Sequence, residues 1–141
     1  MQTFDQLVAF QRAMALVREI YCATESFPKD ERYGLTAQLR RASISVIRHI
    51  AEGQGRLTAG EWRQMLSQGR GSLFEIEAQL LAARELKFLD AASFLRVRMA
   101  AKSVGIALAG LIKYVCSREP RQPGHLATRP PGNLVTRPPA K

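Results

Sequence analysis

Apolar side chains recur every three or four residues along four stretches of the chain, the spacing that places them on one face of an α-helix. The first stretch covers about residues 4–25. Thr3 and Gln6 have the spacing of a capping box at its start. Phe27-Pro28 ends it, because proline disfavours helical geometry in the residue before it. The predicted packing seam consists of Leu7, Phe10, Met14, Val17, Tyr21 and Thr24.

The second predicted helix begins near Lys29-Asp30-Glu31, where two acids suit the positive end of the helix dipole. Gly53 and Gly55 end it, since glycine readily takes the left-handed conformation of a helix terminus. The link to the next helix is short, so we expect the second and third helices to be antiparallel neighbours. The core-facing positions are Leu35, Leu39, Ala42, Val46 and Ile50.

The third predicted helix begins at Thr58, with Glu61 at the spacing of a second capping box. Gly69 and Gly71 lie inside it, and each costs about 1 kcal/mol relative to alanine. We therefore expect another helix to approach closely there. The heptad spacing of the helix is carried by Trp62, Leu66, Gly69, Leu73, Ile76, Leu80 and Ala83.

The fourth predicted helix is capped by Asp90 and has two apolar faces. Its seam consists of Phe94, Val97, Ala101, Val104, Leu108, Leu111 and Val115. Its second face consists of Leu95, Met99, Ile106, Ala109 and Ile112. A helix in a four-helix monomer needs one apolar stripe, so the second is covered either by a thick core within the monomer or by another copy of the chain. We favour self-association, and residues 1–117 predict an all-α, up-down antiparallel four-helix bundle.

Residues 118–141 have a different character. They hold six of the seven prolines and show no sustained apolar periodicity. The segment Leu126-Ala127-Thr128-Arg129-Pro130-Pro131 is echoed by Leu134-Val135-Thr136-Arg137-Pro138-Pro139. Proline removes backbone donors and fixes φ, so we expect a disordered, basic, proline-rich tail. The repeat suits either a docking peptide for an aromatic groove or an appendage with no selected role.

The net charge of the chain indicates what kind of molecule it binds. The 141 residues include 21 Lys and Arg against 12 Asp and Glu, a net charge of +9. Of this, +4 lies in residues 118–141 and +5 in the rest of the chain. Arginine outnumbers lysine, and its guanidinium matches phosphate with two parallel hydrogen bonds. The composition therefore favours a polyanionic partner.

Catalytic and metal-binding patterns are missing from the sequence. A di-iron bundle needs Glu-x-x-His on two helices, whereas this chain offers only the reversed pair His49 and Glu52. No serine has a histidine at a suggestive spacing, and neither Cys22 nor Cys116 has a neighbour that would activate a thiolate. We expect no enzyme activity, no cofactor and no metal.

The sequence shows neither a membrane-spanning pattern nor a signal-peptide pattern, and this bears on where in the cell the protein is expected. No apolar run approaches the roughly 20 residues that cross a bilayer, and the first residues lack a signal-peptide pattern. Cys22 and Cys116 are expected to be reduced, half-buried thiols, although a disulfide between them is the alternative. We expect a cytoplasmic protein without a membrane partner.

Two pairs of arginines have the spacing of a phosphate-binding surface. Arg41 and Arg48 are seven residues apart in the second helix, as are Arg63 and Arg70 in the third. Each pair spans two helical turns, roughly 10 Å. If the two faces align, they form one basic strip, with partial neutralisation by Glu52, Glu75 and Glu77; a simple solvated face is the alternative. The predicted nucleic-acid-binding residues are Arg40, Arg41, Arg48, Arg56, Arg63 and Arg70.

Several short motifs occur in order along the first 115 residues. They are Phe27-Pro28 with Glu31, Tyr33-Gly34-Leu35, Gln38-Leu39-Arg40-Arg41-Ala42, His49-Ile50-Ala51-Glu52-Gly53, Gly55-Arg56 and Gly71-Ser72-Leu73-Phe74-Glu75. With this order and spacing, the chain resembles the four-helix-bundle proteins encoded in intervening sequences of bacterial 23S rRNA genes. One departure is His49, where that family usually has Asn.

The resemblance implies a homopentameric ring with a basic surface. The same family is related to the accessory protein of diversity-generating retroelements, a partner of reverse transcriptase and nucleic acid. Carried over by position, the basic pair is Arg40 and Arg41, with Arg56 at the turn; Gln38, Glu52 and Glu75 match bundle or interface contacts. We therefore expect a non-enzymatic oligomer that binds structured RNA or an RNA–DNA hybrid. The alternative is a scaffold for an acidic protein such as a polymerase.

Overall fold

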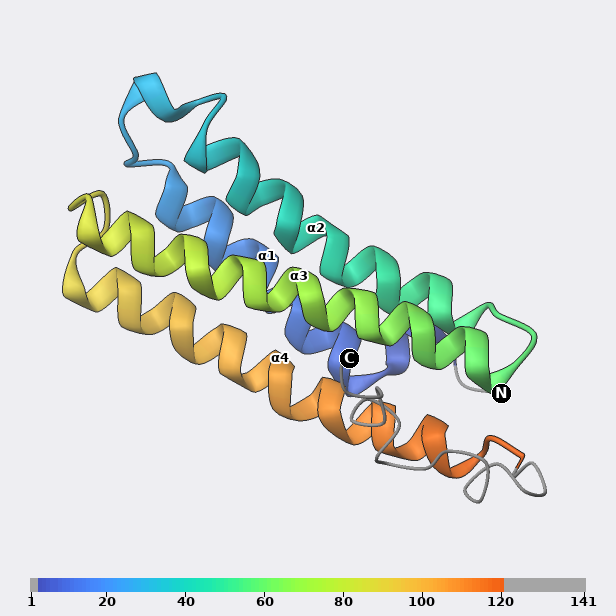
Figure 1. The fold of residues 1–141 in the computed structure, drawn as a ribbon. Coiled ribbons are helices and arrows are strands. Elements are labelled where there is room, and N and C mark those ends of the chain that lie inside the picture. The colour runs from blue at the N-terminus through green and yellow to red at the C-terminus, as the bar shows by residue number, and fades with distance from the viewer. Residues whose placement is uncertain (1–2, 121–141) are drawn as a thin grey trace, which may run out of the picture.

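Four long α-helices make up most of the protein. The computed structural model describes residues 3–120. The helices are α1 (Val8–Thr24), α2 (Leu35–Gln54), α3 (Ala59–Glu85) and α4 (Ala91–Ser117), with short 3-10 turns at Phe4–Gln6 and Lys29–Glu31. They run alternately up and down along one axis (Figure 1), and each helix packs against two neighbours in the cyclic order α1, α2, α3, α4. The predicted all-α four-helix fold is confirmed.

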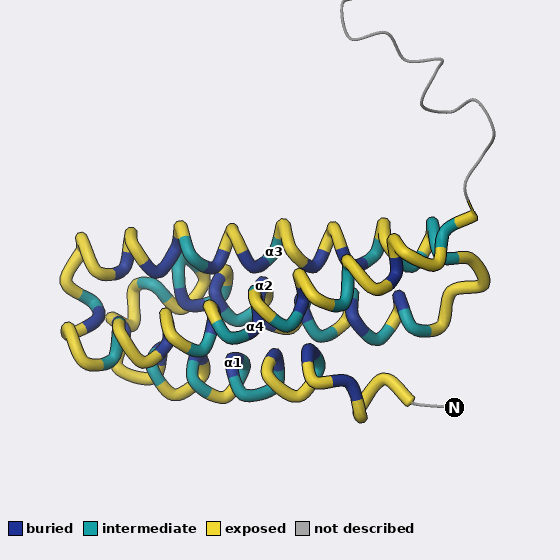
Figure 2. Tube along the Cα trace, turned by 90° about the horizontal axis from the view of Figure 1, so that it is seen from below, coloured by how far each residue is buried: buried dark blue, intermediate teal, exposed yellow. Residues whose placement is uncertain are grey.

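The core runs along the centre of the bundle and receives branched aliphatic side chains from every helix. Leu16 and Ile20 of α1 and Leu39 and Ile50 of α2 all belong to this core, and each is at most 1% exposed. Buried positions recur along the inward side of each helix in Figure 2. Burying one such side chain contributes about 1.5–3 kcal/mol, so the four faces together hold the bundle closed. The fully buried residues of the other two helices include Leu66 and Ile76 of α3 and Val97, Val104 and Leu108 of α4.

The sequence placed three of the four seams correctly. The predicted core positions of α2, α3 and α4 are buried or packed against the core. For α1 the prediction was right only in part. Leu7 and Thr24 are buried and Phe10 packs against the core, but Tyr21 is 39% exposed and Val17 is only partly buried. A second apolar series overlaps the predicted one in this helix, and its small alanines let α1 approach the core closely. That series is Ala9, Ala13, Leu16, Ile20 and Thr24.

The first and second helices begin later than the periodicity suggested. The capping box of Thr3 and Gln6 is present, but it closes a 3-10 turn, and Leu7 then leaves helical geometry with ψ 135°. The segment Lys29–Glu31 is likewise a separate 3-10 turn, and the non-helical Gly34 (φ −102°, ψ −116°) separates it from α2. The acids placed by sequence at the start of α2 therefore lie before it. Glu31 still serves α2, because its carboxylate accepts a hydrogen bond from Leu35 N.

Glycines bring α2 and α3 together at two levels. A Cβ at Gly69 would lie 3.4 Å from His49 Cβ and 3.8 Å from the Val46 carbonyl, which confirms the predicted close approach. At Gly71 the prediction was wrong, since a Cβ there would meet nothing within 4 Å. A Cβ at Gly53 would lie 2.7 Å from Trp62 Cδ1. The absence of a side chain at Gly53 therefore admits the indole ring of Trp62 between the ends of the two helices.

We predict that Gly53→Ala and Gly71→Ala change stability in opposite directions. Alanine at Gly53 must displace the Trp62 ring; overpacking costs about 1–3 kcal/mol, and alanine's helix propensity returns at most about 1 kcal/mol. Alanine at Gly71 meets no neighbour and keeps the propensity gain, up to about 1 kcal/mol. Urea unfolding followed by circular dichroism measures both. Equal stability of Gly53→Ala and wild type would contradict the role given to the Trp62 contact.

The cap of α4 predicts a pH dependence. Asp90 accepts a hydrogen bond from Ser93 N (2.7 Å), and this contact lowers the pKa of Asp90 below its ordinary value of 3.8. A lowered folded-state pKa means that the ionised carboxylate favours the folded protein. Its contribution is complete above the ordinary pKa and is lost as the pH falls through the folded-state pKa.

Asp90→Asn keeps a capping oxygen but cannot titrate, so it serves as the matched variant. We expect the stability difference between wild type and Asp90→Asn to shift in favour of Asp90→Asn as the pH is lowered from 5 to 2. Asp90→Ala, which has no cap, should be less stable than both at pH 7. Thermal unfolding at stepped pH measures this. A difference between wild type and Asp90→Asn that does not change with pH would refute the assignment.

Candidate nucleic-acid interface

A groove of about 310 Å³ runs between α2 and α3, with two arginines on its α2 side. Arg41 and Arg48 line it together with Gln38, Ser45 and Glu75, and Ala42 and Ile44 complete the lining. The arginines lie two helical turns apart on the exposed side of α2, about 10 Å along the axis. Arg41 makes no hydrogen bond or ion pair within residues 3–120. Its guanidinium is therefore available to a ligand.

Side chains of α2 and α3 form polar contacts beside this groove. Ser45 Oγ lies 2.9 Å from Ser72 Oγ and 3.2 Å from His49 Nδ1. These contacts fix the Ser45 hydroxyl at the junction of the two helices. The family that the chain resembles usually has Asn at the position of His49. The histidine takes part in a hydrogen bond with Ser45 through its ring nitrogen Nδ1.

A second polar contact ties the same helices further along the groove. Gln79 Nε2 lies within 3.4 Å of both Gln38 Oε1 and Glu75 Oε2, which accept its hydrogen bonds. Gln79 is only 9% exposed, whereas Gln38 and Glu75 reach the surface. Sequence reasoning missed Gln79, Ser45 and Ser72 as members of the site. The sequence does carry a signal for them, because polar residues at the positions next to the apolar core face of α2 and α3 are placed to contact the neighbouring helix.

Acidic neighbours offset part of the charge of the groove. Arg48 Nε lies 3.9 Å from Glu52 Oε1, and both side chains are well exposed, at 60% and 42%. An exposed pair at this distance contributes little and is readily exchanged for another anion. Glu75 reaches the groove from α3. Two of the three acids expected to neutralise the arginines therefore lie beside them, and the third, Glu77, faces α4.

Arg40 is tied into the bundle, unlike its neighbour Arg41. Its Nε donates to Thr24 Oγ1 (2.9 Å), its Nη2 donates to the Tyr21 carbonyl (3.4 Å), and its guanidinium lies 4.6 Å from the centre of the Tyr21 ring. These contacts join α2 to α1. They also explain why Tyr21 lies at the edge of the bundle rather than in the core. Arg40 thus supports the fold on the side of α2 away from the groove.

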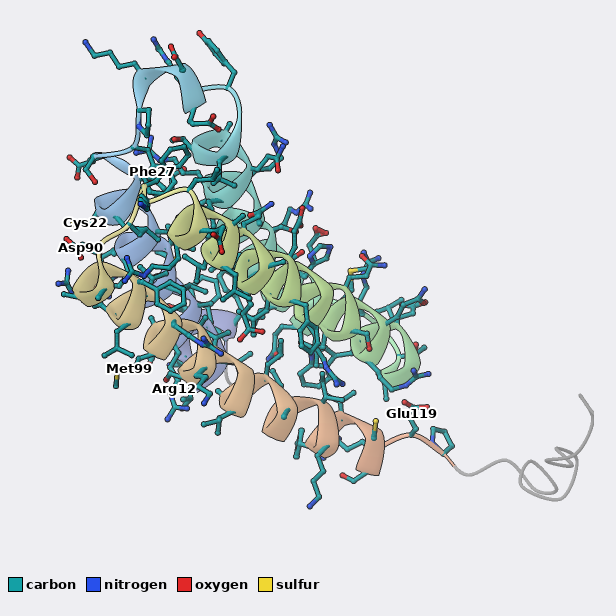
Figure 3. All side chains as sticks on the ribbon, turned by 60° about the vertical axis from the view of Figure 1, so that its left-hand side comes forward. Arg12, Cys22, Phe27, Asp90, Met99 and Glu119 are labelled. Carbon is teal, nitrogen blue, oxygen red and sulfur yellow. The ribbon has the colours of Figure 1, made fainter. Side chains whose placement is uncertain are left out.

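The other predicted arginines lie apart from this groove. Arg56 follows α2 and its Nη2 is 3.6 Å from Met65 Sδ. Arg63 donates a hydrogen bond to the carboxylate of Glu119. This contact raises the pKa of the guanidinium above its ordinary value, and the ion pair neutralises its charge. Glu119 lies just beyond α4 (Figure 3), and Arg70 lines a groove between α3 and α4. The two arginine pairs therefore lie on opposite sides of α3 and do not form one strip.

The second apolar face of α4 is exposed. Leu95, Met99 and Ile106 are 56%, 61% and 71% exposed, and Ala109 is exposed as well. Met99 points away from the bundle in Figure 3. Ile112 is the exception, because it packs partly buried against the core. A thick core within the monomer is therefore excluded for the first four residues.

Further observations concern the cysteines, the acidic and histidine side chains, and helix α4. Cys22 and Cys116 are both exposed, so their expected half-burial was wrong. Within residues 3–120, no group of three His, Cys, Asp or Glu side chains converges as a metal site would require. One described helix, α4, is long and apolar enough to cross a bilayer by length and composition alone, with a mean hydropathy of 1.4 over an 18-residue window. His125 and the Thr-Arg-Pro-Pro repeat lie outside the described residues.

Comparison with known proteins agrees with the motifs and the bundle. The family model of the 23S rRNA-intervening sequence protein matches residues 5–110, which include α1, α2, α3 and most of α4. A search of curated proteins found no match. The family match covers about three quarters of the chain and all the residues that line the α2–α3 groove. The chain therefore belongs to the 23S rRNA-intervening sequence protein family.

Proposed function

We propose that this protein is a non-enzymatic homo-oligomer that binds structured RNA or an RNA–DNA hybrid through the α2–α3 groove. The observation that carries the proposal is the pair Arg41 and Arg48, exposed about two helical turns apart beside polar groups held in place by the bundle. Arg41 has no competing partner within the described residues. Arg48 has two long contacts, an ion pair with Glu52 at 3.9 Å and a hydrogen bond from its Nη2 to Ser45 Oγ at 3.5 Å. Arginine forms two parallel hydrogen bonds with phosphate, so this pair suits a nucleic-acid backbone.

The neighbouring polar groups extend the same surface. Ser45 lines the groove between the two arginines, and Gln38 lines it about one helical turn before Arg41. Hydroxyl and amide groups commonly bond phosphate and sugar oxygens, including the 2′-hydroxyl that distinguishes RNA from DNA. Such contacts position a backbone without reading sequence. We therefore expect binding with little sequence preference and a steep dependence on salt.

The oligomeric part of the proposal rests on an exposed apolar face, and it would also strengthen nucleic-acid binding. The exposed residues Leu95, Met99 and Ile106 form an apolar face that a second copy would cover. A ring would also repeat the α2–α3 groove, and linked sites bind a long polyanion far more tightly than one site does. We favour a pentamer because of the family to which the chain belongs.

We predict that the double variant Arg41→Ala/Arg48→Ala weakens binding of a structured RNA and reduces the slope of log K against log salt by about two. Two lost phosphate contacts explain both effects. Anisotropy titrations with a labelled hairpin at several salt concentrations measure them. Arg18→Ala/Arg32→Ala removes the same charge from other exposed positions and is the control. Equal losses in the two double variants would mean that net charge alone drives binding.

We also predict that Leu95→Glu with Met99→Glu gives a folded monomer. Both side chains are exposed in the single chain, so the substitutions leave the core intact while placing charge in the covered face. Light scattering after size-exclusion chromatography measures the mass. Gln68→Glu, an exposed position on α3, adds one of these charges elsewhere as a control. An unchanged oligomer mass in the double variant would remove this face from the interface.

A protein scaffold is the second candidate. Ile44 lines the same groove and is 40% exposed, which favours a partner that brings apolar as well as acidic groups. An acidic surface of a polymerase such as a reverse transcriptase has that chemistry. A protein that the wild-type chain captures after nuclease treatment, and that Arg41→Ala/Arg48→Ala fails to capture, would favour the scaffold hypothesis over the nucleic-acid hypothesis.

A further inference from the structure

A second groove lies on the other side of α3, between α3 and α4. It measures about 400 Å³ and is lined mainly by apolar groups, among them Leu73, Phe74 and Ile106. Beside it lies a smaller hollow of about 150 Å³, lined by Leu81 and Phe94 among others. Glu77 lines both, so the two hollows adjoin along the same pair of helices. The two adjoining hollows, called the path below, thus hold one phenylalanine each, Phe74 from α3 and Phe94 from α4.

Each phenylalanine is paired with an arginine of its own helix. The guanidinium of Arg70 lies 5.7 Å from the centre of the Phe74 ring, and that of Arg98 lies 5.7 Å from the centre of the Phe94 ring. Phe74 is 58% exposed, although a large aromatic side chain in the centre of a helix normally finds cover. Flat aromatic and guanidinium groups are the surfaces on which unpaired bases stack.

The charge of this path is positive despite its apolar walls. Arg70 and Lys102 line the larger hollow and Arg98 lines the smaller, against the single acid Glu77 among the lining residues of both. No acidic residue occurs within α4, which carries Arg96, Arg98, Lys102 and Lys113. Aromatic platforms bordered by cations are what nonspecific binders of single strands have in common. The bases stack while the cations track the phosphates.

We infer that the α3–α4 groove binds an unpaired stretch of nucleic acid, with a base on the exposed ring of Phe74, a further base against the accessible part of the partly buried Phe94, and phosphates on Arg70, Arg98 and Lys102. The inference rests on the proposed function and extends it. Paired segments contact Arg41 and Arg48 through their backbone, and unpaired nucleotides enter the groove on the other side of α3. Bases inside a duplex are already stacked and cannot reach the rings.

Charge argues for this occupant over two others. The tail of residues 118–141 carries a net +4 and would meet a groove of the same sign. A second copy that met this groove with its own would bring Arg70, Arg98 and Lys102 against an equal set of cations. The self-association proposed above centres instead on Leu95 and Met99, which line neither hollow. A polyanion gains from all three residues at once.

The test uses the full chain and compares a labelled single-stranded RNA of about 12 nucleotides with a hairpin closed by a short, self-stacked loop, which offers no free unpaired stretch. We expect Phe74→Ala to weaken single-strand binding about 5- to 150-fold, the range that corresponds to loss of one stacked base. Phe74→Tyr should keep wild-type affinity, because it retains the ring. Phe74→Leu should weaken binding, because it keeps apolar bulk without an aromatic face. Hairpin binding and oligomer mass should change little in all three variants.

Several outcomes would overturn the inference. Wild-type affinity in Phe74→Leu would show that stacking is not involved. Loss of the oligomer in Phe74→Ala, with single-strand affinity unchanged per chain, would assign the groove to a second copy. Photocrosslinking with 4-thiouridine RNA gives an independent readout, and labelling confined to α2 would contradict the proposed path. If Arg41→Ala/Arg48→Ala abolishes hairpin binding while the Phe74 variants bind single strands normally, the inference fails and the proposed function stands.

Discussion

The close packing of α2 against α3 is the constraint on which the rest of the structure depends. Gly69 lets the backbones approach until a Cβ there would touch His49, and Gly53 admits the Trp62 ring at the end of the pair. This approach brings the Ser45 and Ser72 hydroxyls within 2.9 Å of each other. A wider spacing would separate these hydroxyls and would turn the groove beside them into an open gap. The display of Arg41 and Arg48 thus depends on residues that have no charge.

Helix α3 divides the surface into two regions of different chemistry. On its α2 side the exposed groups are cationic and hydrogen-bonding, and on its α4 side they are aromatic, aliphatic and cationic. The division explains why an arginine pair on α3 does not extend the pair on α2. Arg70 is stacked on Phe74, and Arg63 is matched by Glu119. One positively charged chain therefore has two surfaces with different requirements for a ligand.

The sequence predicted the helices well because their apolar periodicity is strong, and burial enforces it at most positions. It failed in part on α1, where two apolar series overlap and only packing decides between them. It also failed to place the arginines relative to one another. A residue at the border of an apolar face can turn toward either neighbouring helix, and a spacing of seven does not say which. The partner of Arg63 lies 56 residues away, and Arg40 is held by Tyr21 and Thr24 of another helix.

The exposed apolar face of α4 has to be reconciled with the composition of that helix. Its length and hydropathy would allow it to cross a bilayer. However, Val104, Leu108 and Val115 on its opposite face are at most 1% exposed, so extracting α4 would uncover the core of the other three helices. One face of α4 is buried in the bundle, and lysines lie beside its exposed apolar face. This arrangement suits a partner that binds the exposed face while α4 stays in the bundle. A partner that covers Leu95, Met99 and Ile106, a second copy included, must also accommodate Lys102 and Lys113, either opposite acidic groups or at the solvent-exposed edge of the contact.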